Sequence, residues 1–473
     1  WIDLPGDPRQ NYIMRMDFIP ESNDLFIQQM NRPQNTNKVW IATIGGGAPK
    51  NILTETDAAW VETNDQVTWL KNNTYFTWQS ERSGWRHLYR VSRDGKDVQP
   101  ITKGEFDFIE QVGMDVKKGL VYFIASPDNY TQRYLYSAEL LGKGEVKRLS
   151  PMDEQGQHRY DLSPDGKYAV HTFSNSVTPP RIEMVALPSH KTVSVIENNE
   201  EAASQYQQLQ LSPKEFVKTR SGDLQLDAWM IKPVNFDPSK KYPVIEYIYS
   251  GPGDQYVPKT FSSYNWWMTS LAELGFIVVQ VDGMTTSFRS KEFEEVCYKN
   301  LKDAGLPDHI AWIKAAAQKY PYMDIDRVGI FGCSAGGQES TGAVLFHPEF
   351  YKAAYSACGC HDNRMDKIWW NELWMGYPVD ESYSACSNVD NAHLLSRPLM
   401  LVVGELDDNV DPASTMQVAN ALIKANKDFE LVVIPGAHHT MGEDFGEHKR
   451  YDFFVRHLMG VTPPSWDKVK TGK

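Results

Sequence analysis

The sequence predicts two regions of different fold class: an all-β region up to about residue 205, followed by a doubly wound α/β domain whose sheet is mostly parallel. Two observations carry this prediction. Short alternating apolar runs between glycine-rich turns fill the first region. Buried apolar strands alternate with amphipathic helices in the second, a pattern typical of parallel sheets covered on both faces.

The all-β region contains a repeat. Pairs that start with an apolar residue and end with an aromatic one begin strands at Val39-Trp40, Leu88-Tyr89 and Leu135-Tyr136, with a weaker copy at Ile182. The spacing of 47 to 49 residues, with about four strands per unit, is typical of β-propeller blades. We therefore interpret residues 1–205 as about four blades of a partial β-propeller and expect further blades N-terminal to them.

The second region, residues 206–473, alternates strands and helices in order. The predicted strands are 241–249, 276–281, 328–331, 399–403 and 429–434, and the predicted helices are 301–319, 413–425 and 443–459. A further helix is expected directly after the strand at 328–331. This order predicts a single doubly wound sheet.

Composition excludes some classes of function and leaves others open. The net charge of −13 argues against a nucleic-acid binder, which needs a basic surface. There is no run of about 18 apolar residues, so no membrane span is predicted. The five cysteines are Cys297, Cys333, Cys358, Cys360 and Cys386, and we interpret them mainly as small buried residues rather than as metal ligands or disulfides.

A nucleophile motif lies between the strand at 328–331 and the helix after it. Gly332-Cys-Ser-Ala-Gly336 has the G-x-S-x-G pattern, in which a sharp turn from strand to helix exposes the serine and allows no side chains beside it. The N-terminus of the helix then directs backbone N–H groups at a developing oxyanion. These features predict an α/β-hydrolase with Ser334 as nucleophile, and Cys333 beside the end of the strand.

A serine nucleophile needs a base and an acid that orients the base, and in hydrolases of this fold they follow in the order Ser, Asp, His. Two acids, Asp407 and Asp408, follow the strand at 399–403, and two histidines, His438 and His439, follow the strand at 429–434. Both loops lie at the carboxyl edge of a parallel sheet. Spacing alone leaves open which acid and which histidine belong to the triad.

Several motifs together resemble the prolyl oligopeptidase family, in particular its dipeptidyl peptidase IV branch. They are Asn31-Arg-Pro-Gln-Asn35, the segment from Ser80 to Leu88, Tyr247-Ile-Tyr249-Ser-Gly-Pro252, Asp407-Asp-Asn-Val410 and Pro435-Gly-Ala-His-His439. The resemblance covers nearly the whole chain. It implies Asp407 and His439 as triad members beside Ser334, and an oxyanion hole made by the Tyr249 hydroxyl and the Ala335 N–H. It also implies that Asn409 and Val410 line the substrate pocket.

This chain departs from the branch around the nucleophile. Cys333 and Ala335 stand where the branch usually has Trp and Tyr, which leaves a preference for proline before the scissile bond open. By position, Trp370 takes the place of a pocket tyrosine. We find no counterpart of the glutamate pair with which dipeptidyl peptidases bind a free amine; Glu200-Glu201 lies at the boundary of the two regions, and we expect the true pair upstream of residue 1.

The resulting hypothesis is a serine peptidase that hydrolyses short peptides through an acyl-enzyme and releases N-terminal dipeptides, with no metal or organic cofactor. The alternatives are an acylaminoacyl peptidase or esterase with the same triad, and an inactive binding protein. Peptide substrates are the expected partners, and the resemblance is compatible with a homodimer. Relatives from bacteria favour export to the periplasm or beyond.

Overall fold

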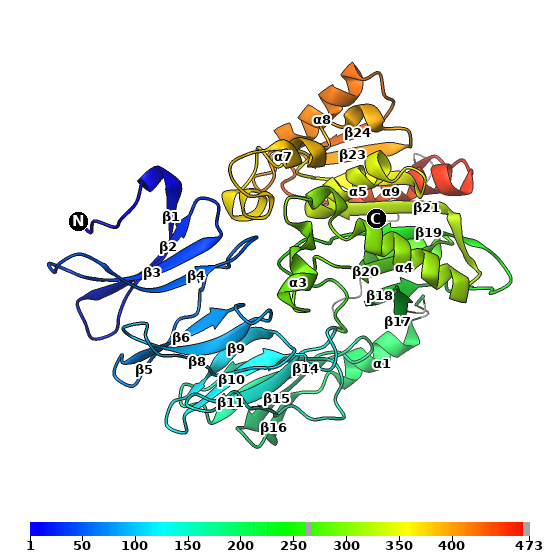
Figure 1. The fold of residues 1–473 in the computed structure, drawn as a ribbon. Helices are drawn as coiled ribbons and strands as arrows, with labels where there is room; N and C mark the ends of the chain where they lie inside the picture. Colours follow the sequence, from blue (N-terminus) through cyan, green and yellow to red (C-terminus); the bar gives the residue numbers. More distant parts are fainter. Residues whose placement is uncertain (210, 213, 223, 262–265, 467–473) are drawn as a thin grey trace.

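The computed structural model describes residues 1–209, 211–212, 214–222, 224–261 and 266–466. Four small antiparallel sheets form an arc that lies against an α/β domain built on one eight-stranded sheet (Figure 1). Both predicted fold regions are therefore present. Among the described helices, none combines the length and the apolar character that crossing a membrane requires.

Each small sheet contains four strands that pair in chain order. The first sheet has β1 (Asn11–Phe18), β2 (Asp24–Asn31), β3 (Thr36–Thr43) and β4 (Lys50–Thr56), and the second has β5 (Trp69–Leu70), β6 (Tyr75–Ser80), β7 (His87–Ser92) and β8 (Val98–Pro100). The third has β9 (Phe108–Asp115), β10 (Leu120–Ala125), β11 (Tyr134–Glu139) and β12 (Val146–Arg148), and the fourth has β13 (Gln157–Leu162), β14 (Tyr168–Ser174), β15 (Arg181–Ala186) and β16 (Lys191–Glu197). The repeated pairs of the sequence all fall on the third strand of a sheet, which explains their period.

Consecutive sheets pack face to face. Phe26 of the first sheet contacts Phe76 and Trp78 of the second, with ring centroids 5.2 and 6.4 Å apart. Leu88 of the second sheet shares a core with Phe108 of the third, and a further core joins the third sheet to the fourth. Each sheet thus buries apolar side chains against its neighbours in sequence, an arrangement like that of propeller blades.

The eight-stranded sheet has the order β17-β18-β20-β19-β21-β22-β23-β24. Its strands are β17 (Lys214–Ser221), β18 (Leu224–Ile231), β19 (Tyr242–Tyr247), β20 (Ile277–Asp282), β21 (Met323–Cys333), β22 (Tyr351–Ala357), β23 (Leu399–Gly404) and β24 (Glu430–Ile434). The pairs β17–β18 and β18–β20 are antiparallel, and the other pairs are parallel.

Helices cover both faces of this sheet. The helices of the described residues are α1 (Glu200–Gln208), α2 (Trp266–Glu273), α3 (Lys291–Glu294), α4 (Leu306–Lys319), α5 (Ala335–Phe346), α6 (Leu373–Met375), α7 (Glu381–Cys386), α8 (Pro412–Lys424) and α9 (Glu443–Phe454). Short 3-10 turns lie at Pro8–Gln10, Glu295–Cys297, Leu301–Asp303 and Ala392–Leu394, and π-helical turns lie at Ile368–Glu372 and Val455–Met459. Core residues of α4, α5 and α8 pack on one face and those of α2 and α9 on the other, so neighbouring strand residues such as Val244 and Ile245 belong to opposite cores.

The structure corrects some predicted boundaries. The helix predicted at 301–319 begins at Leu306, because Gly305 adopts a φ of 74° that interrupts the helical path. The strand β22 was not predicted, and neither was the antiparallel hairpin of β17 and β18. The predicted boundary between residues 205 and 206 falls inside α1, between the last small sheet and β17.

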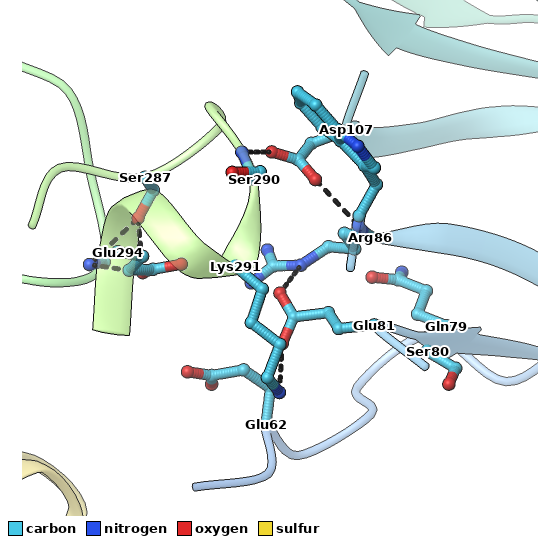
Figure 2. Close-up of polar contacts among 12 residues, drawn as sticks. Glu62, Gln79, Ser80, Glu81, Arg86, Asp107, Ser287, Ser290, Lys291 and Glu294 are labelled. Carbon is cyan, nitrogen blue, oxygen red and sulfur yellow. Dashed lines mark hydrogen bonds and ion pairs between the residues drawn. The ribbon is translucent and has the colours of Figure 1, made fainter. Parts of the chain in front are cut away.

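The small sheets meet the α/β domain through a charged network (Figure 2). Lys291 Nζ lies 2.8 Å from Asp57, 3.6 Å from Glu81 and 3.2 Å from Glu295. The Arg86 guanidinium lies 3.3 Å from Glu81, in a cavity of about 360 Å³ that Lys291 also lines. These contacts tie the second small sheet to the segment that leads into α3.

Candidate active site

Ser334 occupies the turn from β21 to α5. Its φ and ψ are 62° and −123°, and its N–H donates to the carbonyl of Ala357 at 3.0 Å. A positive φ is strained for a residue with a side chain. The structure thus has the sharp turn from strand to helix that the motif predicts. Ala335 is the first residue of α5, and N–H groups in the first turn of a helix lack the usual partners within the helix.

The glycines of the motif are required by close backbone contacts. A Cβ at Gly332 would lie 2.5 Å from the carbonyl oxygen of Ile248, and one at Gly336 would lie 2.2 Å from the same atom. A Cβ at Gly337 would lie 2.1 Å from the carbonyl oxygen of Ala357. All three distances are shorter than real Cβ contacts, so a side chain is excluded at each of these three positions.

Asp407 and His439 are brought together by the loops after β23 and β24. His439 Nδ1 donates to Asp407 Oδ2 at 2.8 Å, and Asp407 Oδ1 accepts hydrogen bonds from the N–H groups of Asn409 and Val410 at 3.0 and 2.9 Å. The Asp407 side chain is fully buried, whereas 21% of the His439 side chain is exposed. This arrangement orients the imidazole with its Nδ1–H on Asp407, so Nε2 is the nitrogen available for proton transfer.

The alternative pair of residues lies at the surface. His438 and Asp408 are 3.5 Å apart, with 66% and 82% of their side chains exposed. A solvated pair of this kind cannot hold an imidazole in one orientation. The geometry therefore favours Asp407 and His439, the two residues that the resemblance implies.

Within the described residues, no hydrogen bond joins Ser334 to His439. The Nε2 atom of His439 instead lies 3.8 Å from the Sγ atom of Cys358. Hydrogen bonds between a nucleophile and its base are often loose in a site without substrate. A small rotation of either side chain is thus needed before a proton can pass between them.

The pKa of His439 is shifted by its neighbours. Burial lowers it, but the adjacent Cys358 and then Asp407 outweigh burial and raise the pKa to about 9. The pKa of Cys358 is itself raised, by its hydrogen bond with Cys333 and by burial.

Tyr249 lies on the loop after β19, close to the nucleophile. Burial raises the pKa of its phenol, and a hydrogen bond with Ser334 opposes that shift. The loop is held from behind: the N–H of Ser250 donates to Glu339 at 3.1 Å, and the N–H of Gly253 donates to Ser287 at 2.9 Å and to Glu294 at 3.2 Å. The phenol is therefore protonated at neutral pH and able to donate a hydrogen bond beside Ser334.

A small cavity of about 100 Å³ opens at Ser334. Its wall contains the predicted residues together with four that were not predicted: Tyr249, Ser334, Ala335, Trp370, Asn409, Val410, Cys360, Asp366, Lys367 and Trp369. Lys367 donates to the carboxylate of Asp366 at 2.8 Å and to the carbonyl of Asn409 at 2.6 Å, which ties the tryptophan segment to the loop of Asp407. In the sequence, only the run of tryptophans indicates the part of the wall formed by residues 360–370.

The first small sheet supports the same wall. Gln34 donates to the carbonyl of Ile368 at 2.7 Å, Arg32 lies 3.5 Å from Glu372, and Trp374 packs against Trp60 with ring centroids 6.5 Å apart. The wall is thus held in place by contacts between the two regions of the chain. By contrast, Glu200-Glu201 is exposed in the first turn of α1.

Two family models match the chain. Residues 262–461, which contain Ser334, Asp407 and His439, match the prolyl oligopeptidase family, and residues 1–180 match the dipeptidyl peptidase IV N-terminal region. Residues 262–461 belong to the prolyl oligopeptidase family. These matches confirm the resemblance seen in the sequence motifs.

Curated relatives and a solved structure place this family member near dipeptidyl peptidases. Dipeptidyl peptidase 8 of Mus musculus is 25% identical over 93% of the chain, and that of Homo sapiens is 24% identical over 94% of it. The chain spans 54% of each, about half the length of the curated relatives it matches. The crystal structure of Porphyromonas gingivalis dipeptidyl peptidase 4 superposes with a TM-score of 0.87 and 28% identity, over 97% of this chain and 65% of the other.

Proposed function

We propose that this chain forms the catalytic part of a serine peptidase that releases dipeptides from the N-termini of short peptides. The observation that carries the proposal is the partly buried 2.8 Å hydrogen bond from His439 to Asp407, at the sheet edge where Ser334 occupies the turn from β21 to α5. The names of the relatives support the dipeptide product.

In the proposed reaction Ser334 Oγ attacks the carbonyl carbon of the scissile bond while its proton passes to His439 Nε2. The carbon–nitrogen bond then breaks, and the same proton goes to the leaving amine. A water molecule, deprotonated by His439, releases the acyl group from Ser334 and restores the enzyme. Asp407 holds the imidazole tautomer and stabilises its positive charge throughout.

The tetrahedral intermediates carry a negative oxygen. We assign the Tyr249 hydroxyl and the N–H of Ala335 as the donors that hydrogen-bond to it. Loss of one such donor costs about 3–4 kcal/mol of transition-state stabilisation. Asn409, Val410 and Trp370 line the cavity of about 100 Å³ and are the proposed contacts for the residue before the scissile bond.

The four small sheets are proposed to belong to a β-propeller that restricts access to the site, with the catalytic domain beginning near residue 206. Their face-to-face packing in sequence order and the match to the dipeptidyl peptidase IV N-terminal region support this. A propeller cover restricts hydrolysis to short or unfolded peptides.

A panel of dipeptide amides, each with a free or blocked amine and a varied second residue, tests the proposal. We expect cleavage of free-amine substrates, and a loss of about 10⁴- to 10⁶-fold in kcat for Ser334→Ala. Ser204→Ala, at an exposed position of α1, is the matched control with full activity. Preferred cleavage of blocked substrates or acyl esters makes the chain an acylaminoacyl peptidase or esterase instead.

Labelling with a fluorophosphonate that reacts with serine nucleophiles is an independent test of Ser334 as the nucleophile. Labelling of the unmodified chain and not of Ser334→Ala supports the acyl-enzyme route. A chain that resists labelling is an inactive hydrolase fold, and the proposal of catalysis then fails.

A further inference from the structure

Two thiols and an imidazole meet behind the nucleophile. The Sγ atoms of Cys333 and Cys358 and a ring nitrogen of His439 all lie within 4.8 Å of one another. The sheet creates this cluster: Cys333 ends β21, Cys358 directly follows β22, and β21 and β22 pair in parallel with Cys333 opposite Ala357. His439 reaches the same point from the loop after β24.

We propose that Cys333, Cys358 and His439 form a binding site for a thiophilic divalent metal ion of the zinc class. Thiolate sulfur and imidazole nitrogen are the ligands that zinc prefers, and two cysteines with one histidine and an open fourth position form a known kind of zinc site. No acidic side chain belongs to the cluster among the described residues, which disfavours magnesium and calcium.

The spacing of the atoms fits a tetrahedral ion. Zinc–sulfur and zinc–nitrogen bonds of about 2.3 and 2.0 Å place a sulfur and a nitrogen ligand about 3.5 Å apart. Cys358 Sγ and His439 Nε2 are 3.8 Å apart, so only a small movement is needed. The five cysteines are free thiols, and the ion takes the place of any proton on the two sulfur atoms and on His439 Nε2, which passes to solvent.

Asp407 prepares the imidazole for this ion. Its carboxylate accepts the Nδ1 proton of His439 at 2.8 Å, which orients Nε2 towards the cluster, 3.8 Å from Cys358 Sγ. A carboxylate that holds a metal-binding histidine in this way is common around zinc and strengthens binding. Access is also available, because Cys333 and His439 are half-buried rather than enclosed.

Metal binding at this site has a consequence for catalysis, which rests on the proposed function. The lone pair that the ion takes is the one that must accept the proton of Ser334, so the metal-bound chain lacks a general base. Metal binding and peptide hydrolysis are then mutually exclusive, and a chelator restores hydrolysis.

Cobalt(II) reports the site without any need for activity. The reduced protein, freed of chelator, is titrated with Co²⁺ under anaerobic conditions, and a thiolate-to-cobalt charge-transfer band is expected to saturate at one ion per chain. Cys333→Ala and Cys358→Ala should each weaken binding by at least about 100-fold, and Asp407→Asn by about 10- to 100-fold. Zn²⁺ should displace the cobalt and remove the band.

Cys386→Ala is the matched control, because Cys386 is a buried free thiol outside the cluster. Cys333→Ala is the safer of the two test variants, since its side chain is half-buried at a strand end; near-ultraviolet circular dichroism checks that it folds. Absence of the band, or a band that Cys333→Ala keeps and Cys386→Ala loses, overturns the proposal.

The second arm measures peptide hydrolysis with and without Zn²⁺ for each variant. Inhibition that Cys333→Ala relieves by at least about tenfold in zinc concentration, and that Cys386→Ala does not, supports the link to the base. A cobalt band without zinc inhibition keeps the metal site and refutes its coupling to catalysis. A chain without hydrolysis in any form contradicts the proposed function and leaves the cobalt result to decide the site.

Discussion

Glu294 lies where the charged network meets the loop of Tyr249, and its ionisation should destabilise the fold at alkaline pH. The carboxyl is buried and accepts hydrogen bonds from Ser287 Oγ at 2.8 Å and from the N–H of Gly253 at 3.2 Å. Burial raises its pKa from 4.5 to about 8; Arg86 opposes this and Glu81 adds to it. The protonated form is therefore the one that the folded chain prefers.

The direction in which pH changes the free energy of unfolding follows from how many protons each state binds. Between about pH 4.5 and about pH 8 the folded chain holds the Glu294 proton and the unfolded chain does not, so the free energy of unfolding falls as pH rises through this range. Each pKa unit corresponds to about 1.4 kcal/mol, so the full shift corresponds to about 5 kcal/mol. Glu294→Gln removes this cost and keeps an oxygen for both hydrogen bonds.

Urea unfolding at about pH 5.5 and about pH 9 measures the effect. At the lower pH, one unit above the ordinary pKa, we expect the variant to be more stable than the unmodified chain by about 1.4 kcal/mol, and at the higher pH by ~3–5 kcal/mol. Glu292→Gln, two residues away and exposed, is the control and should show no such gain. The reasoning is refuted if Glu294→Gln gains no more than Glu292→Gln between the two pH values.

Three further predictions concern the site itself. Tyr249→Phe should lower kcat for peptide hydrolysis by about 10²–10³-fold with little change in KM, as the loss of one oxyanion donor predicts; an unchanged kcat in steady-state assays removes Tyr249 from that role. The kcat/KM should rise with pH through the raised pKa of His439, towards about 9, because only the neutral imidazole accepts a proton. Asp407→Asn should lower both the midpoint and the rate; a midpoint at or below 6.5 in the unmodified chain shows that the pKa of His439 is not raised, and an unchanged midpoint in Asp407→Asn removes Asp407 as a cause. Gly337→Ala should cost ~3 kcal/mol or more in urea unfolding, because its Cβ would meet the last carbonyl oxygen of β22 at 2.1 Å, whereas Gly47→Ala, with open space around its Cβ, should cost far less.

The α/β domain was largely predictable because its strands are buried on both faces. Such strands form apolar runs that stand out in the sequence, as at 399–403, and the loops after them must gather at one sheet edge. The placement of Ser334, Asp407 and His439 follows from that edge. The strand β22 was harder to predict, because it consists mainly of alanine, lysine, serine and tyrosine and its role as a strand depends on the neighbours that enclose it.

Features formed by long-range packing left no local pattern. The approach of Cys358 to Cys333 and His439 depends on β22 lying between β21 and β23. The network of Arg86, Lys291 and their acids exists only because the second small sheet docks on the segment before α3. The residues are visible in the sequence, but their partners lie on other elements, so neither cluster could be predicted from spacing.

The backbone of Ser334 has a consequence for how such a chain changes over time. With φ at 62° and ψ at −123°, this position stores strain that glycine would not feel, so Ser334→Gly is a substitution that favours the folded state while abolishing a nucleophile. Selection for stability alone would favour glycine at position 334. The serine at this strained turn therefore lowers the stability of the fold in exchange for a nucleophile.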